Sequence, residues 1–420
     1  MSITAFVRLR PIFVCVLACC SVTATLNSAY AAKQKQPLSD GQDKKNLRFK
    51  PGKGVSFISD DNNFKAKMSA WTQADAAFYN SDITPLTDGT RIRRGRVSLA
   101  MQLFHDWRLR GEYDFTNKKN MDQRGFQDLY LRYTGIKHSA FTIGNLKQPV
   151  GLEWQTSSKN STFMERALSQ ALIPSYQMGF AASTHGKSWS LTTGVFGETL
   201  RDGISDGNGW GTGGRATYSP FHNKDLTLHF GVSGNYRERG RNSSNLRFSS
   251  RPEANVANVR FANTGGMSRV SDYTLLGLEF AALHGPFSLQ AEYLGNFINR
   301  NSGKDDLQFN GWYVYGSWFI TGESRKYQPK SGNFGHIKPK HRVDHGGLGA
   351  FEVAARYSEL NLNDHRITGG RESNITLGVN WYLNSYFRLM GNYVFVETDR
   401  NALNGIEQPE IFELRAQLEL

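Results

Sequence analysis

Apolar and polar side chains alternate with a period of two along most of this chain. The alternation is clear at residues 107–115, 287–297 and 351–358, and it continues to the last residue in 412–420. Since successive side chains of a β-strand point to opposite faces of the sheet, each run predicts a strand with one apolar and one polar face. The pattern therefore predicts an all-β protein.

Turn signals separate these runs. Short signals stand at 284–286 and 383–385, whereas long stretches rich in Gly, Ser, Asn and Arg occupy 238–270 and 321–347. Glycine and proline interrupt regular structure, so all four segments are expected to be connections. Short turns at one end of the strands and long loops at the other are typical of an outer-membrane barrel.

A sheet in lipid has to pair every backbone N–H and C=O group, which requires it to close on itself. Residues 61–420 comprise 360 residues, and roughly 20–25 residues per strand and connection give about 16 strands. We therefore expect a transmembrane antiparallel β-barrel of about 16 strands. A barrel of that size encloses an aqueous channel.

The N-terminus reads as a targeting segment. Residues 1–31 have a basic start at Arg8 and Arg10, an apolar stretch, and an A-x-A cleavage site at 29–31, which together predict a signal peptide. A lipoprotein signal ending at Cys19 and an N-terminal membrane anchor are the alternatives. We expect a polar, flexible leader over 32–60, the barrel over 61–420, and location in the bacterial outer membrane.

Composition narrows the chemistry. All three cysteines lie within 1–31, so the mature chain can form no disulfide and no thiolate site. Removing Arg8 and Arg10 from 50 basic residues leaves 48 against 37 acidic ones, a balance of +11. This surplus predicts anionic partners, namely small anions and the outer-membrane lipid and lipopolysaccharide, and export argues against nucleic acid. The mean hydropathy of −0.49 argues against a helical membrane protein.

Several motifs resemble one family. The stretch 144–153 (GNLKQPVGLE), TSSKNSTFMER at 156–166, GWYVYGSWFITGESRKY at 311–327 and GAFEVAARYSELNL at 349–362 are similar to the phosphate-selective porin family, the O and P porins. The likeness extends from about residue 60 to 420. It implies a trimeric, 16-stranded, anion-selective channel whose third loop folds inward as a constriction, passing phosphate or related small anions by diffusion.

The resemblance also implies pore-lining, anion-binding residues. They are an arginine pair, an acidic residue, two hydroxyls with a neighbouring lysine, and a strand arginine: Arg93, Arg94, Asp128, Ser157, Ser158, Lys159 and Arg215. One position departs from the family, since Trp154 stands where its phosphate-specific members have a lysine. That difference leaves anion preference in place and makes tight phosphate specificity the weaker expectation.

Physical chemistry supports these roles independently. The guanidinium group presents a planar fork of donors that matches phosphate oxygens, and rings of cations are the usual device of anion pores. For Arg93–Arg96, a solvated patch facing lipopolysaccharide is the alternative. No catalytic residue, cofactor or metal is expected. The functional alternatives are a porin for other anionic or general small solutes and a structural or adhesive barrel plugged by its own loops.

Overall fold

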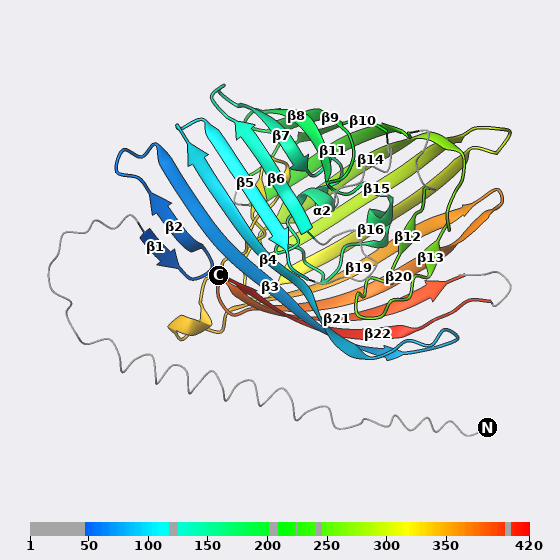
Figure 1. Ribbon diagram of the computed structural model, residues 1–420. Coiled ribbons are helices and arrows are strands. Elements are labelled where there is room, and N and C mark those ends of the chain that lie inside the picture. Colours follow the sequence, from blue (N-terminus) through cyan, green and yellow to red (C-terminus); the bar gives the residue numbers. More distant parts are fainter. Residues whose placement is uncertain (1–46, 117–124, 201–208, 224, 241–245, 400–404) are drawn as a thin grey trace, which may run out of the picture. The chain divides into compact units, whose positions relative to one another are not determined.

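The protein is represented by a computed structural model that describes residues 47–116, 125–200, 209–223, 225–240, 246–399 and 405–420 (Figure 1). The predicted signal peptide and most of the predicted leader lie outside these residues.

A closed antiparallel sheet forms the body of the molecule. Each strand pairs with its neighbour along the chain, and the last strand pairs with the first, which closes the barrel. The barrel strands are β3 (Phe64–Asn80), β4 (Gly89–Leu103), β5 (Trp107–Asp114), β6 (Gly125–Tyr133), β7 (Ser139–Leu146), β8 (Gln177–His185), β9 (Trp189–Phe196), β10 (Gly211–Tyr218), β11 (Leu226–Glu238), β14 (Val270–His284), β15 (Phe287–Arg300), β16 (Leu307–Phe319), β19 (Ala350–Asp364), β20 (Ile367–Tyr382), β21 (Phe387–Thr398) and β22 (Glu410–Glu419). These 16 strands confirm the predicted barrel.

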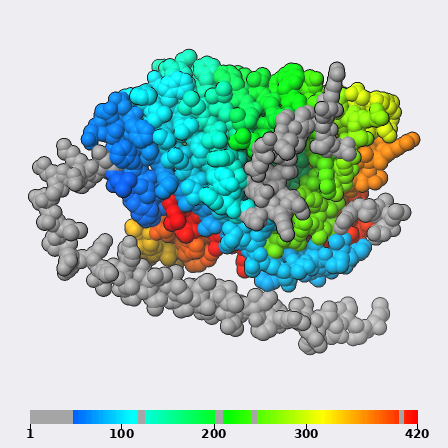
Figure 2. Space-filling model, viewed as in Figure 1, coloured from blue at the N-terminus to red at the C-terminus, as the bar shows by residue number. Residues whose placement is uncertain are grey.

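The closure joins the two ends of the described chain. Register pairs run from Glu410 opposite Asn80 to Glu419 opposite Trp71. Leu420 then exchanges two backbone hydrogen bonds with Ala70, at 2.7 and 3.2 Å. In Figure 2 the red C-terminal residues lie directly against the blue strands. The alternating C-terminal segment is thus the closing strand.

Part of the predicted flexible leader is ordered as strands. β1 (Leu47–Lys50) pairs with β2 (Gly54–Ile58), and β2 pairs with residues 65–68 of β3. β22 ends opposite Trp71, so β2 covers the stretch of β3 that β22 leaves unpaired. This backbone pairing explains why the described part of 32–60 is not an irregular leader, despite its polar composition.

The two faces of the barrel wall differ as the alternation predicts. On β20 the side chains of Ile375, Leu377 and Val379 are 49%, 47% and 53% exposed, whereas those of Asn374 and Thr376 are buried. The apolar side chains therefore face outward and the polar ones inward. A membrane barrel has this arrangement, because its outer face contacts lipid and its inner face contacts water.

Aromatic pairs mark one end of the barrel. Where strands meet the short turns, large rings on neighbouring strands face each other across the register, and each ring is exposed or half-buried. The pairs are Trp107 with Tyr133, Trp189 with Tyr218, Phe287 with Trp318, and Phe351 with Trp381. Trp and Tyr favour the membrane–water interface, so we interpret this band as an interfacial girdle.

Three connections are long enough to hold structure of their own. Segment 147–176 contains α2 (Leu152–Gln155) and the 3₁₀ turn η1 (Leu168–Leu172). Segment 246–269 contains β12 (Ser249–Ser250) and β13 (Ala262–Asn263). Segment 320–349 contains β17 (Tyr327–Gln328), β18 (Asn333–Phe334) and η2 (Val343–His345). Among the described residues no helix is long and apolar enough to cross a membrane.

The placement of segment 320–349 corrects one expectation. The sequence grouped it with 238–270 as a long loop at one end of the barrel. Strand connections alternate between the ends, and the segment between β16 and β19 falls at the end of the short turns 285–286 and 383–386. The backbone N–H of Val343 donates to the carbonyl of Leu383 at that end, over 2.9 Å.

The three segments pack against inward-facing wall residues. One apolar cluster joins Val150, Leu168 and Leu172 of segment 147–176 to Leu246 and Phe248 of segment 246–269, and both to strands β14, β15, β16 and β19. A second cluster joins Leu152 to Phe334 of segment 320–349 and to β14. Burial of these side chains fixes the segments, because each removes apolar area from water.

Candidate functional site

A break in the alternation of β4 turns two consecutive arginines inward. Gln73 on β3 pairs with Arg94 and Ala74 pairs with Ile92, so Arg93 is an extra residue, a β-bulge. Arg93 and Arg94 are both buried, whereas Ile92 is exposed on the outer face. A bulge re-aims a side chain in this way, and here it doubles the cationic charge at one level of the lumen.

The charge of Arg93 is compensated by segment 147–176. Its Nε and Nη2 atoms donate to the two carboxylate oxygens of Glu165 over 2.6 and 2.8 Å. Arg415 on β22 also donates to Glu165, over 2.8 Å. Burial alone raises the pKa of Glu165, but Arg93, Arg94 and Arg415 together hold that pKa well below its ordinary value. Glu165 is therefore an anionic anchor between two wall strands.

Arg94 is bound less completely. Its Nη1 donates to the Gln73 amide oxygen over 2.7 Å. The buried Arg94 Nε and Arg93 Nη1 atoms have no hydrogen-bond acceptor within the described part of the chain. Buried donors without acceptors are costly, so these N–H groups suit an anion that reaches them.

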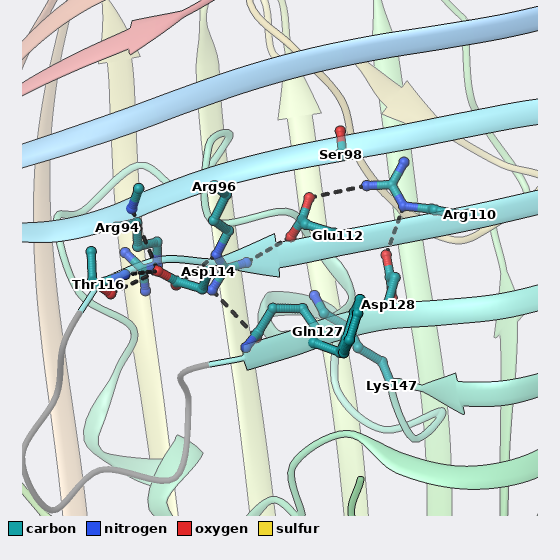
Figure 3. A network of polar contacts seen from close by, with 12 residues as sticks. Arg94, Arg96, Ser98, Arg110, Glu112, Asp114, Thr116, Gln127, Asp128 and Lys147 are labelled. Carbon is teal, nitrogen blue, oxygen red and sulfur yellow. Dashed lines mark hydrogen bonds and ion pairs between the residues drawn. The ribbon is translucent and has the colours of Figure 1, made fainter. Parts of the chain in front are cut away.

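Asp128 forms an ion pair with an arginine of the neighbouring strand. On β6 both Gln127 and Asp128 lie opposite Glu112, which gives a second bulge with two inward polar side chains. The Nε of Arg110 donates to Asp128 over 2.8 Å, and the Nη2 of Arg110 reaches Glu112 over 3.2 Å (Figure 3). Of the two roles open to an acid here, acceptor from a protonated phosphate or partner of an arginine, this geometry provides the second.

The next candidates, Ser157, Ser158 and Lys159, follow α2 after its C-cap residue Thr156. Both serines are half-buried. The Lys159 Nζ atom pairs with Glu419 over 2.8 Å, and its carbonyl accepts from Gln417 over 3.1 Å. The Gln417 amide oxygen accepts in turn from Gln73, the partner of Arg94. The structure thus connects Lys159 to Arg94 through two glutamines.

Arg215 belongs to a different part of the lumen. On β10 it forms a two-point ion pair with Glu279, over 2.8 and 2.6 Å. It also donates to the carbonyls of Ser331 and Gly332, over 3.0 and 2.7 Å. Its charge is neutralised and its remaining donors hold segment 320–349, so the structure does not bring Arg215 together with Arg93 and Arg94.

An arginine-rich cavity of about 720 Å³ lies beside the arginine pair. We call it the arginine cavity. Most of its lining residues belong to segments 147–176 and 246–269, and others come from β4 and β11, which are well separated around the barrel wall. Two of its lining residues are acidic, Glu165 and Glu253, and eight are arginines: Arg93, Arg94, Arg166, Arg237, Arg239, Arg247, Arg251 and Arg260.

Sequence reasoning missed most of these arginines. Arg247, Arg251 and Arg260 come from the stretch 238–270, which was interpreted only as a connection. Arg237 follows the period-two pattern of β11 and could have been placed inward on that basis. The three loop arginines could have been noticed because arginine recurs within the long stretch 238–270.

The arginines of the cavity repel one another. Burial first, and then Arg260, Arg91 and Arg93, lower the pKa of Arg251 to about 10. The Nε atom of Arg251 is buried without an acceptor among the described residues. A bound anion relieves this repulsion, so the site is electrostatically suited to negative charge.

Other wall arginines hold the backbone of segment 147–176. Arg356 donates to the carbonyl of Glu165 over 3.1 Å, Arg388 donates to that of Ser161 over 2.8 Å, and Arg415 donates to that of Met164. The sequence FMER at 163–166 is therefore a stretch packed against the wall. Within the described ranges, no group of three or more His, Cys, Asp or Glu side chains could hold a metal ion.

Comparison with known proteins places this geometry in a family. The family model "Phosphate-selective porin O and P" matches residues 65–420. Porin O of Pseudomonas aeruginosa is 29% identical over 418 residues, covering 90% of this chain and 93% of that protein.

Solved structures match the fold. The anion-selective porin of Comamonas acidovorans has a TM-score of 0.52 at 12% identity, with 85% of this chain and 100% of that chain covered. In vitro folded OmpT of Vibrio cholerae, in its trimer form, has a TM-score of 0.51 at 12% identity, with 85% and 99% covered. The barrel, its lumen and the match to nearly all of its strands lead to one assignment: the chain is a bacterial outer-membrane protein that belongs to the phosphate-selective porin O and P family.

Proposed function

We propose that this porin is a water-filled, anion-selective diffusion channel for phosphate or related small anions. The observation that carries the proposal is the arginine cavity, where eight arginines face two glutamates. Clefts lined by charge of one sign concentrate ions of the other sign. The similarity to Porin O, whose family is described as phosphate-selective, supports an anion-selective channel. The fold match to the anion-selective porin is consistent with it.

Unpaired donors supply the second support. Five side chains that line the arginine cavity have buried N–H groups without an acceptor in the described structure: Arg93, Arg94, Trp154, Gln170 and Arg251. An anion that enters loses water, and these N–H groups replace the lost hydrogen bonds. The anion then moves on by diffusion, so the channel makes and breaks no covalent bond and is not an enzyme.

The other candidate residues have distinct roles in this proposal. Segment 147–176 narrows the pore, and Ser157, Ser158 and Lys159 present hydroxyl and ammonium donors to anions beyond the arginine pair. Asp128 positions Arg110, and Arg215 positions segment 320–349. A homotrimer embedded in outer-membrane lipid and lipopolysaccharide is the assembly we propose, in line with the trimer form described for the Vibrio neighbour.

Single-channel recording tests the proposal. The purified protein in a planar bilayer should conduct chloride, and added phosphate should block that current in a saturable way. Conduction without block by phosphate would indicate a porin for other or general solutes. Absence of conduction would indicate a barrel plugged by its own segments.

A further inference from the structure

Trp154 lies at the wall of the arginine cavity with two cations against its ring. The guanidinium of Arg166 lies 4.8 Å from the ring centroid, and the Nζ atom of Lys147 lies 5.1 Å from it. The Lys147 ammonium also donates to the Trp154 carbonyl over 2.8 Å. Cations within about 6 Å of an aromatic face are attracted by its quadrupole, so the ring holds two positive charges close together.

The indole contributes a donor of its own. Trp154 is 8% exposed, and its Nε1 atom is buried without an acceptor among the residues that the structure describes. The Nε atom of Arg166 donates to the Glu153 carbonyl over 3.1 Å, and its Nη2 atom donates to the Thr156 carbonyl over 3.0 Å. These bonds fix the plane of the guanidinium and leave its other N–H groups available. Trp154 and Arg166 both line the arginine cavity.

We propose that Lys147, Trp154 and Arg166 form an oxyanion subsite whose affinity depends on the protonation of Lys147. The proposal rests on the anion channel proposed above and adds a particular site to it. Arg166 supplies a fixed charge, the indole N–H supplies a neutral donor, and Lys147 supplies a charge that changes with pH. The ligand class is a small tetrahedral oxyanion, because such ions accept several hydrogen bonds at once.

The surroundings of Lys147 make its charge variable. Charged groups on four elements act on it: Arg166 in its own segment, Asp128 on β6, Arg96 on β4 and Glu112 on β5. The ring of Tyr176 lies 5.9 Å from its Nζ atom. Burial first, and Arg166 second, lower the pKa of Lys147 to about 7. Lys147 is therefore charged below about pH 7 and neutral above it, and a bound anion favours the charged form.

The test uses sulfate, because its charge does not change near neutral pH whereas that of phosphate does. Sulfate block of the chloride current is measured on the full-length channel at about pH 6 and about pH 8. The protonated fraction of a group titrating near pH 7 differs about tenfold between these values. We expect wild-type block to be up to about tenfold stronger at the lower pH.

Three variants separate the contributions. In Lys147→Met, sulfate should block the chloride current weakly and to the same extent at both pH values. In Lys147→Arg, sulfate should block the current strongly at both pH values, because arginine does not titrate in this range. Trp154→Phe keeps an aromatic ring for the cations and loses the indole N–H group. Sulfate block of this variant should therefore be several-fold weaker at both pH values, and it should still depend on pH.

Two results would overturn the subsite. One is sulfate block that still depends on pH in both Lys147→Met and Lys147→Arg. The other is sulfate block of Trp154→Phe that is as strong as that of the wild type. Lys147→Arg is expected to gain affinity at high pH, so misfolding cannot imitate its predicted result. The reversal potential of the wild type is recorded first. A cation-selective channel would refute the proposed function itself. An anion-selective channel whose variants show the same sulfate block as the wild type would refute only the subsite.

Discussion

Arg93 and Arg94 are adjacent but differ in how their charge is compensated. Glu165 neutralises Arg93, whereas the side-chain hydrogen bond of Arg94 within the described ranges goes to the neutral amide of Gln73. A charge-assisted hydrogen bond contributes about 1.5–3 kcal/mol, which is about tenfold or more in affinity. We therefore expect Arg94→Gln to weaken phosphate block of chloride current by about tenfold. Arg93→Gln should weaken it less, because the Arg93 charge is already compensated by Glu165 and Arg415 still pairs with that carboxylate in the variant; equal effects in a titration of block would contradict this distinction.

Lys159 is restrained by its ion pair with Glu419, and its side chain is partly exposed. Glu419→Gln removes the negative charge and releases the ammonium group, so phosphate block should become stronger by a few-fold. The matched control is Glu410→Gln at the other end of β22, where the carboxylate bonds Tyr393 and Asn80. Weaker block in Glu419→Gln, or the same change in both variants, would show that Lys159 does not contribute to the anion path.

At the scale of elements, Arg215 acts on segment 320–349. Arg215→Met removes its bonds to the carbonyls of Ser331 and Gly332 and leaves Glu279 its contact with His229, as far as the described residues show. The segment should loosen, which raises single-channel conductance and current noise and leaves the sign of the reversal potential unchanged. A drop in anion preference with quiet currents would instead indicate a direct role for Arg215 in anion binding.

The strands followed from the sequence because alternation reports directly on a wall with an apolar and a polar face, and their number followed from the length of residues 61–420. The site followed less completely. The bulge at Arg93 depends on the partner register of Gln73 and Ala74, which alternation within one strand does not contain. The end at which segment 320–349 lies depends on the strand count, since each strand reverses the direction of the chain. Trp154 was recognised as a departure, but its contacts with Lys147 and Arg166 arise only from tertiary packing.

At the scale of the whole molecule, charge and barrel geometry act together. The predicted mature balance of 48 basic against 37 acidic residues does not by itself produce selectivity. In the function proposed above, selectivity arises because strands and inward segments place arginines together around the arginine cavity. Charges exposed to water are screened within about 10 Å at 0.1 M salt and about 3 Å at 1 M. Anion preference should accordingly weaken as the salt concentration rises.

The reversal potential of the purified channel in a KCl gradient tests the central claim most directly. The account predicts a potential of anion-selective sign, largest at low salt and reduced at about 1 M. A cation-selective potential, or one that salt does not affect, would contradict it, because the arginines of the lumen would then not control which ions pass.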